Sequence, residues 1–173
     1  MSVEIRACTD GWRDAFAAEA GLLRPLLGKG LLALHHVGST AVPGLAAKPV
    51  IDMLGVIRSL AEVDAAEPAL RALGYVGKGE NGIVGRRYFH KSNADGSRSH
   101  HLHIFEPGSA EIERHLAFRD YLRAHPDVAQ RYAGLKAAIA PGSTRPVYQA
   151  RKAPFIAATM ADALEWYRRQ SGG

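Results

Sequence analysis

The sequence predicts a single α+β domain, a β-sheet flanked by helices and followed by a helical segment. Two apolar runs, residues 31–37 and 50–57, have the length and continuity of buried strands. From residue 109 onward, apolar residues return at helical spacing. The 173 residues suffice for one domain and are too few for two ordinary ones. We expect about 10–106 to form the sheet portion and about 109–169 the helical portion.

Each predicted element has a local signal. Asp10 is placed to cap a first helix over residues 10–28, whose apolar residues recur every three or four positions. The continuous apolar character of 31–37 and 50–57 predicts interior strands covered on both faces. Turns at 80–82 and 93–96 predict an antiparallel meander of the strands that they join. The remaining elements are strands at 75–79, 83–91 and 99–105 and helices at 60–73, 109–124, 127–140 and about 151–167.

The composition favours anionic ligands. The formal net charge is +5 and the pI is near 9.6, which suits nucleotides, phosphorylated metabolites or RNA. RNA is the least favoured of these, because the basic residues are spread along the chain and Trp12, Phe16 and Phe118 lie on core stripes. A single cysteine, Cys8, excludes a disulfide within the chain and fits a reducing compartment. No stretch has the length of a signal peptide or a membrane span, so we expect a cytoplasmic protein without a membrane partner.

A short turn followed by a lone acid is the most informative stretch. Gly38, Ser39 and Thr40 come directly after the first apolar run, and small residues of this kind let backbone N–H groups and hydroxyls converge on an anion. Asp52 is the single carboxylate in the second apolar run. A buried carboxylate costs free energy unless it is paired, hydrogen-bonded or bound to a metal. The stretch therefore predicts an anion-binding turn beside a functional acid.

Two histidines in a later strand are the second candidate feature. Side chains in a strand alternate between faces, so His101 and His103 share one face. If their strand lies beside the one that carries Asp52, the three side chains converge and supply ligands for a divalent metal. The alternative is that the histidines only hydrogen-bond a ligand or their neighbours in the sheet.

Several cations are candidates for phosphate contact. Lys48 lies four residues before Asp52 and would act as a point charge. Arg86 and Arg87 are adjacent in a predicted strand, so only one of them can face a cleft. The chain has no phosphate-binding loop of the kinase type, no dinucleotide-binding glycine motif and no serine nucleophile elbow.

The residues quoted above, with further blocks, resemble the GrpB family. The resemblance rests on residues 38–45, residues 48–52, His101-Leu102-His103 and residues 118–122, and it covers most of the chain. It implies the fold of the nucleotidyltransferases, with a mixed sheet, and a relation to a domain fused to some dephospho-coenzyme A kinases. The residues discussed above make Asp52, His101 and His103 the candidate catalytic and metal-binding residues. The candidate phosphate-binding residues are Gly38, Ser39, Thr40, Lys48, Arg86 and Arg87, to which the resemblance adds Arg119, Lys136, Tyr148 and Lys152.

The chain departs from the nucleotidyltransferase pattern at the metal acids. That pattern has Asp-x-Asp and a third acid on a neighbouring strand, whereas this chain has Leu54 two residues after Asp52 and histidines on the candidate neighbouring strand. Two magnesium ions need several carboxylates, and one acid cannot hold both. The expected cofactors are a nucleoside triphosphate and a divalent ion, magnesium or manganese before zinc.

Three functions follow from these residues. The first is a nucleotidyltransferase-like enzyme that binds a nucleotide or another phosphate-bearing small molecule and transfers a nucleotidyl group, with His101 or His103 as metal ligand or general base. The second is a non-catalytic module that binds a nucleotide, a coenzyme A-like ligand or a protein. The third is an enzyme with one metal held by Asp52, His101 and His103.

Overall fold

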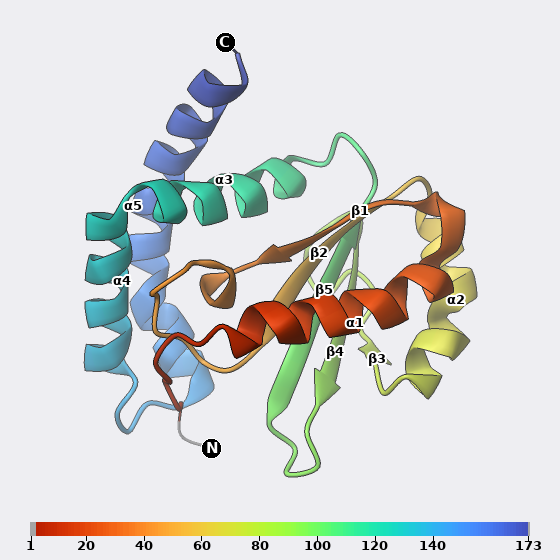
Figure 1. Ribbon diagram of the computed structural model, residues 1–173, viewed down its shortest axis with the longest axis horizontal. Coiled ribbons are helices and arrows are strands. Elements are labelled where there is room, and N and C mark those ends of the chain that lie inside the picture. The colour runs from red at the N-terminus through yellow and green to blue at the C-terminus, as the bar shows by residue number, and fades with distance from the viewer. Residues whose placement is uncertain (1–2, 173) are drawn as a thin grey trace.

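The computed structural model describes residues 3–172 and contains a five-stranded mixed sheet with helices on both faces (Figure 1). The strands are β1 (Leu31–Val37), β2 (Ile51–Ile57), β3 (Val76–Gly77), β4 (Arg86–Ser92) and β5 (Arg98–Phe105). The α-helices are α1 (Gly11–Leu27), α2 (Leu60–Ala72), α3 (Ala110–Ala124), α4 (Pro126–Ile139) and α5 (Arg145–Ser171), and two short 3₁₀ turns are η1 (Gly28–Gly30) and η2 (Ser39–Ala41). The predicted α+β class is confirmed.

The sheet has the strand order β1-β2-β5-β4-β3. Strands β2 and β5 are parallel, and the other neighbours are antiparallel, so the predicted meander of β3, β4 and β5 is confirmed. In the parallel pair Asp52 lies opposite His101. The strand with the acid is therefore next to the strand with the histidines.

Strand β1 is an edge strand, which corrects the prediction that both apolar runs are interior. It pairs only with β2, and Leu32 on it is 54% exposed. An apolar run reports burial of the faces of a strand and carries no information about whether both of its edges are paired. Strand β2, by contrast, is paired on both sides, as predicted.

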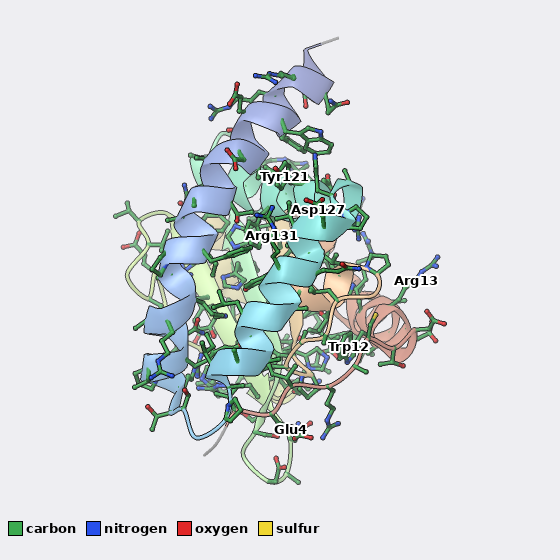
Figure 2. The ribbon with its side chains drawn as sticks, turned by 90° about the vertical axis from the view of Figure 1, so that its left-hand side faces the viewer. Glu4, Trp12, Arg13, Tyr121, Asp127 and Arg131 are labelled. Atoms are coloured by element: carbon green, nitrogen blue, oxygen red, sulfur yellow. The ribbon has the colours of Figure 1, made fainter. Side chains whose placement is uncertain are left out.

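The two faces of the sheet differ in character. On the face that we call the core face, Met53, Leu102 and Phe89 pack with α1 and α2 in the main hydrophobic cluster. The opposite face, which we call the site face, carries Asp52 and His101. Figure 2 shows α4 and α5 side by side in front of the sheet, and α3 packs Ile112 and Leu116 against the site face.

Helix α5 begins at Arg145, earlier than the predicted 151. Pro146 occupies the first helical turn, where a missing N–H and a fixed φ are compatible with a helix start. Tyr148 and Lys152 consequently lie four residues apart on one helix.

Other boundaries also differ from those predicted. Asp10 makes no side-chain capping bond, and the backbone N–H of Gly11 donates instead to the Thr9 hydroxyl at 3.2 Å. Strand β3 has only two residues, and β4 starts at Arg86 because the residues before it form turns. Within residues 3–172, no helix combines the length and apolarity that a membrane span needs.

Candidate functional site

The first residue of the Gly-Ser-Thr turn must be glycine, both for its backbone conformation and because there is no room for a Cβ atom. Gly38 has a φ of 72°, in the left-handed region that other residues rarely adopt. A Cβ atom at this position would lie 2.6 Å from Oδ2 of Asp52. The backbone at Gly38 therefore packs directly against the carboxylate of Asp52.

A buried hydrogen-bond chain holds the rest of the turn. The Thr40 hydroxyl donates to the carbonyl oxygen of Val50 at 3.2 Å, and its oxygen lies 2.8 Å from Nε2 of His36. Because the hydroxyl has one proton, Nε2 of His36 must carry the proton that it donates to Thr40. Burial lowers the pKa of His36 to about 4, so this imidazole is neutral, and its ring stacks on Phe16. Sequence reasoning missed His36, although its position at the end of an apolar strand marks it as a buried polar group.

Asp52 and His101 form a hydrogen-bonded pair at the centre of the site. Nδ1 of His101 donates to Oδ1 of Asp52 at 2.9 Å. Burial raises the pKa of Asp52, but the bond with His101 and the nearby positive groups outweigh it, so its pKa lies below the usual value and it is ionised. Nε2 of His101 is buried and has no hydrogen-bond partner among the described residues. The pair thus leaves one imidazole nitrogen for a ligand.

His103 lies on the same face, as predicted, but belongs to a different group of side chains. Its Nδ1 is 3.4 Å from the guanidinium of Arg86, and its ring lies between those of Tyr88 and His115, each 5.2 Å away between centroids. Burial lowers its pKa to about 3. Among residues 3–172, no three His, Cys, Asp or Glu side chains are gathered as a metal-binding group.

The residues present do not fit a two-magnesium centre. Leu54, at the position of the second acid, is 0% exposed and packs with Val37 and Phe105 in an apolar cluster. Among residues 3–172, Asp52 is the one carboxylate that lines the cavity beside the Gly-Ser-Thr turn, whereas two bridged magnesium ions would need more.

Helices α4 and α5 close the site with lysines. A cavity of about 130 Å³ lies between these helices, the Gly-Ser-Thr turn and the first residues of β2 and β5, and we call it the lysine pocket. It is lined by Ser39, Thr40, Ala47, Lys48, Val50, Asp52, His101, Lys136, Tyr148, Gln149 and Lys152. The structure therefore brings together eight of the predicted phosphate-binding and catalytic positions, namely Ser39, Thr40, Lys48, Asp52, His101, Lys136, Tyr148 and Lys152.

The lysines are held by neutral groups. Lys136 is 2% exposed, donates from Nζ to the carbonyl oxygen of Ala46 at 2.6 Å, and lies 4.5 Å from the centroid of the Tyr132 ring. The ring of Tyr148 lies near Lys48 at 5.1 Å and near Lys152 at 4.7 Å, measured from each Nζ to the ring centroid. Each contact is a cation–π interaction, which stabilises the cation without neutralising it.

Burial and mutual repulsion lower the pKa values of two of these lysines. Burial, with the charges of Lys152 and Lys48, lowers the pKa of Lys136 to about 7. Burial and the charge of Lys48 lower the pKa of Lys152 to about 8, although Asp52 acts in the opposite direction. In the part of the chain that the structure describes, none of the three lysines forms an ion pair, so the pocket has three cations against one carboxylate. Such an imbalance favours an anionic ligand.

Three predicted arginines are engaged elsewhere. Arg86 donates to the carbonyl oxygens of Glu80 and Asn81, and Arg119 to that of His36. Arg87 lies on the core face and pairs with Asp64 of α2 at 2.6 Å, so the two adjacent arginines do point to opposite faces. None of these arginines lines the lysine pocket.

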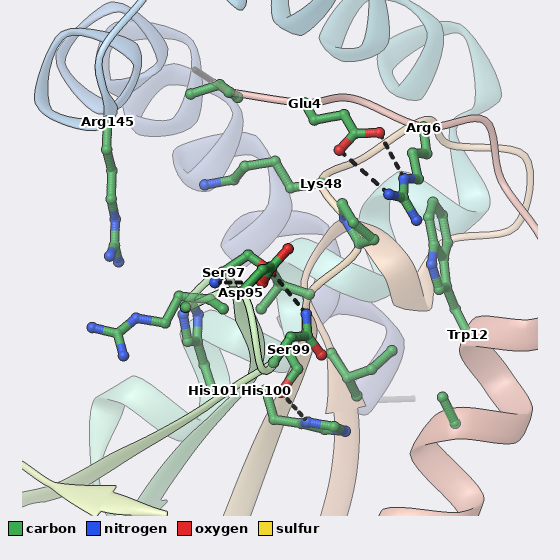
Figure 3. Close-up of a pocket in the computed structure, with 18 residues that line it drawn as sticks. Glu4, Arg6, Trp12, Lys48, Asp95, Ser97, Ser99, His100, His101 and Arg145 are labelled. Carbon is green, nitrogen blue, oxygen red and sulfur yellow. Dashed lines mark hydrogen bonds and ion pairs between the residues drawn. The ribbon is translucent and has the colours of Figure 1, made fainter. Parts of the chain in front are cut away.

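A larger groove of about 770 Å³ adjoins the lysine pocket and shares Lys48, Val50 and His101 with it. Figure 3 shows Arg145, Lys48 and His101 on one side of this groove and Trp12 with the Glu4–Arg6 ion pair on the other. Arg145 is exposed at the first turn of α5. Arg145 was not among the predicted site residues, since the last helix was expected to begin only at about residue 151.

Comparison with known proteins identifies the family. The family described as GrpB protein matches residues 2–162. UPF0157 protein YqkA of Bacillus subtilis is 49% identical over 138 residues, which are 80% of this chain and 40% of YqkA, so the chain spans less than half of that relative. A dephospho-CoA kinase of Mycolicibacterium paratuberculosis is 30% identical over 169 residues, covering 83% of this chain and 42% of the kinase. The expected relation to a domain found with that kinase is thus supported.

Solved structures support the same conclusion. The crystal structure of GrpB from Enterococcus faecalis superposes with a TM-score of 0.89 at 38% identity, covering 95% of this chain and 99% of that one. The Cid1 poly(U) polymerase in its MgGTP-bound form has a TM-score of 0.53 at 18% identity, over 77% of this chain and 44% of Cid1, and this likeness concerns the fold alone. The protein has a nucleotidyltransferase-like fold and belongs to the GrpB family.

Proposed function

We propose that the protein binds a phosphate-bearing small molecule, with nucleotides as the first class to test, and that the phosphates occupy the lysine pocket. The observation that carries this proposal is the uncompensated charge of Lys48, Lys136 and Lys152 around a small cavity. Buried lysines without ion-pair partners destabilise a protein, so a fold that buries Lys136 and Lys152 next to the half-buried Lys48 gains from an anion that neutralises them.

The remaining groups of the pocket suit phosphate oxygens. Ser39 brings a hydroxyl group from the Gly-Ser-Thr turn, and Gln149 adds an amide. Nε2 of His101 is a buried atom without a hydrogen-bond partner among the described residues, and in its N–H form it can donate to an oxygen of the ligand. A phosphate group has enough oxygen atoms to satisfy several of these groups together with the lysines.

The adjoining groove is suited to the organic part of the ligand. The lysine pocket, at about 130 Å³, has room for little more than phosphate, whereas the groove of about 770 Å³ is within the range of ligand sites. Figure 3 shows Trp12 on the far side, while Lys48 and Arg145 lie nearer the junction, and Ala15, three residues after Trp12 on α1, also lines the groove. A single ligand with phosphates at the junction and a ring-sized group toward Trp12 would match this distribution.

Catalysis of group transfer is a second candidate function, favoured by the Asp52–His101 pair. In this second candidate function, Nε2 of His101 would accept the proton of an attacking hydroxyl group while Nδ1–H donates to Asp52, instead of donating to a phosphate oxygen. Release of pyrophosphate from a nucleoside triphosphate would establish this function if His101→Gln abolishes the release and still binds the ligand. Binding without any turnover would leave the non-catalytic module as the function.

Calorimetric titration tests the binding function. Inorganic tripolyphosphate tests the phosphate contacts without an organic group, and ATP, GTP and CTP test the same contacts with a nucleoside added. We expect Lys152→Met to weaken tripolyphosphate binding by about tenfold or more, since one charge-assisted contact is lost. Lys29→Met, at an exposed lysine that lines neither cavity, is the matched control and should leave the affinity unchanged. If none of the four compounds binds, the proposal is refuted.

A subsite test uses two alanines of α1. Ala15→Phe fills part of the groove, whereas Ala18→Phe adds the same ring at an exposed position outside it. If the organic part lies in the groove, Ala15→Phe removes any advantage of a nucleoside triphosphate over tripolyphosphate, and Ala18→Phe retains it. Equal effects of the two variants would place the organic part elsewhere.

A further inference from the structure

The carboxylates of the site are too few and too confined to recruit metal ions for the ligand. Asp52 is the one acid that lines the lysine pocket. Its Oδ1 accepts the hydrogen bond from His101, and its Oδ2 lies against the backbone of Gly38 so closely that a Cβ there would be 2.6 Å away. Magnesium requires octahedral oxygen ligands at about 2.0–2.1 Å. Both oxygens of Asp52 therefore already have close neighbours where such an ion would bind.

The lysines occupy the space in which a metal would do its work. A divalent ion between Asp52 and a phosphate would share one small cavity with the ammonium groups of Lys48 and Lys152, because both lysines line the lysine pocket together with Asp52. Like charges in a partly buried cavity repel each other more strongly than in water. Protonated lysines and a metal ion are thus alternative means of neutralising the same phosphates.

We propose that the lysine pocket selects the metal-free form of its ligand, so that Lys48, Lys136 and Lys152 neutralise phosphates that a two-metal enzyme would neutralise with magnesium. This inference rests on the proposed function, because it concerns the ionic form in which the proposed phosphate ligand binds. Asp52 then holds the imidazole of His101 in place and does not bridge a metal to the ligand. As an anion beside phosphate, Asp52 opposes binding by repulsion.

Calorimetric titration with tripolyphosphate in EDTA and in excess Mg²⁺ tests this inference on the wild-type protein. Magnesium complexes the free polyphosphate, so a pocket that takes only the metal-free form shows an affinity reduced in proportion to the free ligand, by about tenfold or more. An affinity that is unchanged or higher in Mg²⁺ would overturn the inference and leave the proposed function intact. Absence of binding in both buffers would refute the proposed function, and this inference with it.

An aspartate variant gives a second, independent readout. Asp52→Asn retains an oxygen that can accept from His101 but loses the charge, and we expect the affinity for tripolyphosphate in EDTA to rise by about threefold or more. A bridging metal ligand would show the opposite, a loss of binding in Mg²⁺. Asp64→Asn, which removes a carboxylate that pairs with Arg87 outside the pocket, is the matched control and should change neither value. Should Asp52→Asn fail to fold, the comparison of the two buffers on the wild-type protein decides the question.

Discussion

Buried charges on the two faces of the sheet are treated in opposite ways. On the core face, Glu19 of α1 is 6% exposed and accepts hydrogen bonds from the Tyr75 hydroxyl at 2.8 Å and from Nζ of Lys91 at 3.0 Å. On the site face, Lys136 and Lys152 are also buried but form no ion pair among the described residues, and Asp52 is one acid against the three lysines of the pocket. The buried acid of the core face is therefore paired with a cation, whereas the buried lysines of the site face are not paired with acids.

This difference indicates that the buried charges of the core face stabilise the fold, whereas those of the lysine pocket form a candidate binding site. A matched pair holds α1 on the sheet, and losing one partner leaves the other charge buried and unpaired. The unmatched lysines weaken the unliganded fold, because burial and mutual repulsion disfavour their charged forms. Such a cost is compensated when an anion binds, and the lysine pocket is therefore the part of the molecule to test with ligands.

Substitutions on the two faces should change stability in opposite directions. We expect Glu19→Ala to lower the free energy of unfolding by about 3 kcal/mol, because Lys91 loses its partner in a partly buried place. Lys136→Met replaces a buried ammonium by an apolar chain of similar length and should raise it by about 1 kcal/mol. Denaturant unfolding of the unliganded proteins measures both values.

The control for this pair is an exposed acid. Glu165→Ala, whose side chain is 64% exposed and pairs with Arg169 on the surface of α5, should change the free energy of unfolding by less than about 0.5 kcal/mol. A loss of stability in Lys136→Met comparable to that in Glu19→Ala would show that both groups of charges are structural and would remove the distinction between the two faces.

The affinity for anions should fall as pH rises. The pKa values of Lys136, about 7, and Lys152, about 8, lie below the ordinary value for lysine, so both side chains are charged below these values and neutral above them. Sulfate keeps its charge over this range, and we expect its affinity to be about tenfold or more higher at about pH 6 than at about pH 9. In Lys136→Met the part of this decline centred near pH 7 should disappear. A flat profile would mean that these lysines do not contact the anion.

The sequence predicted the placement of side chains on β2 and β5 better than the contacts around them. The period of two placed His101 and His103 on one face, and the lone acid in an apolar run marked Asp52. The sequence could not show that β2 and β5 are neighbours, because their parallel pairing joins residues about fifty positions apart. The structure shows this pairing. His103 then proved to contact Arg86 and His115, which strand periodicity cannot distinguish from contact with Asp52.

The helical half of the site was less accessible to sequence reasoning. Lys136, Tyr148 and Lys152 were identified through the family resemblance, because helical spacing tells which face is apolar but not which helix crosses the sheet beside Asp52. The guanidinium groups of Arg86, Arg87 and Arg119 suggested phosphate contact, yet each is engaged by a carbonyl or carboxylate oxygen that the sequence does not reveal. Arg145 was missed with the first turn of α5.

A crystal structure of the protein with tripolyphosphate, grown with magnesium present, tests the central claim most directly. We predict phosphate oxygens within hydrogen-bond distance of the Nζ atoms of Lys48, Lys136 and Lys152, and no cation between Asp52 and the ligand. Polyphosphate bound away from these lysines, or a magnesium ion bridging it to Asp52, would contradict the account.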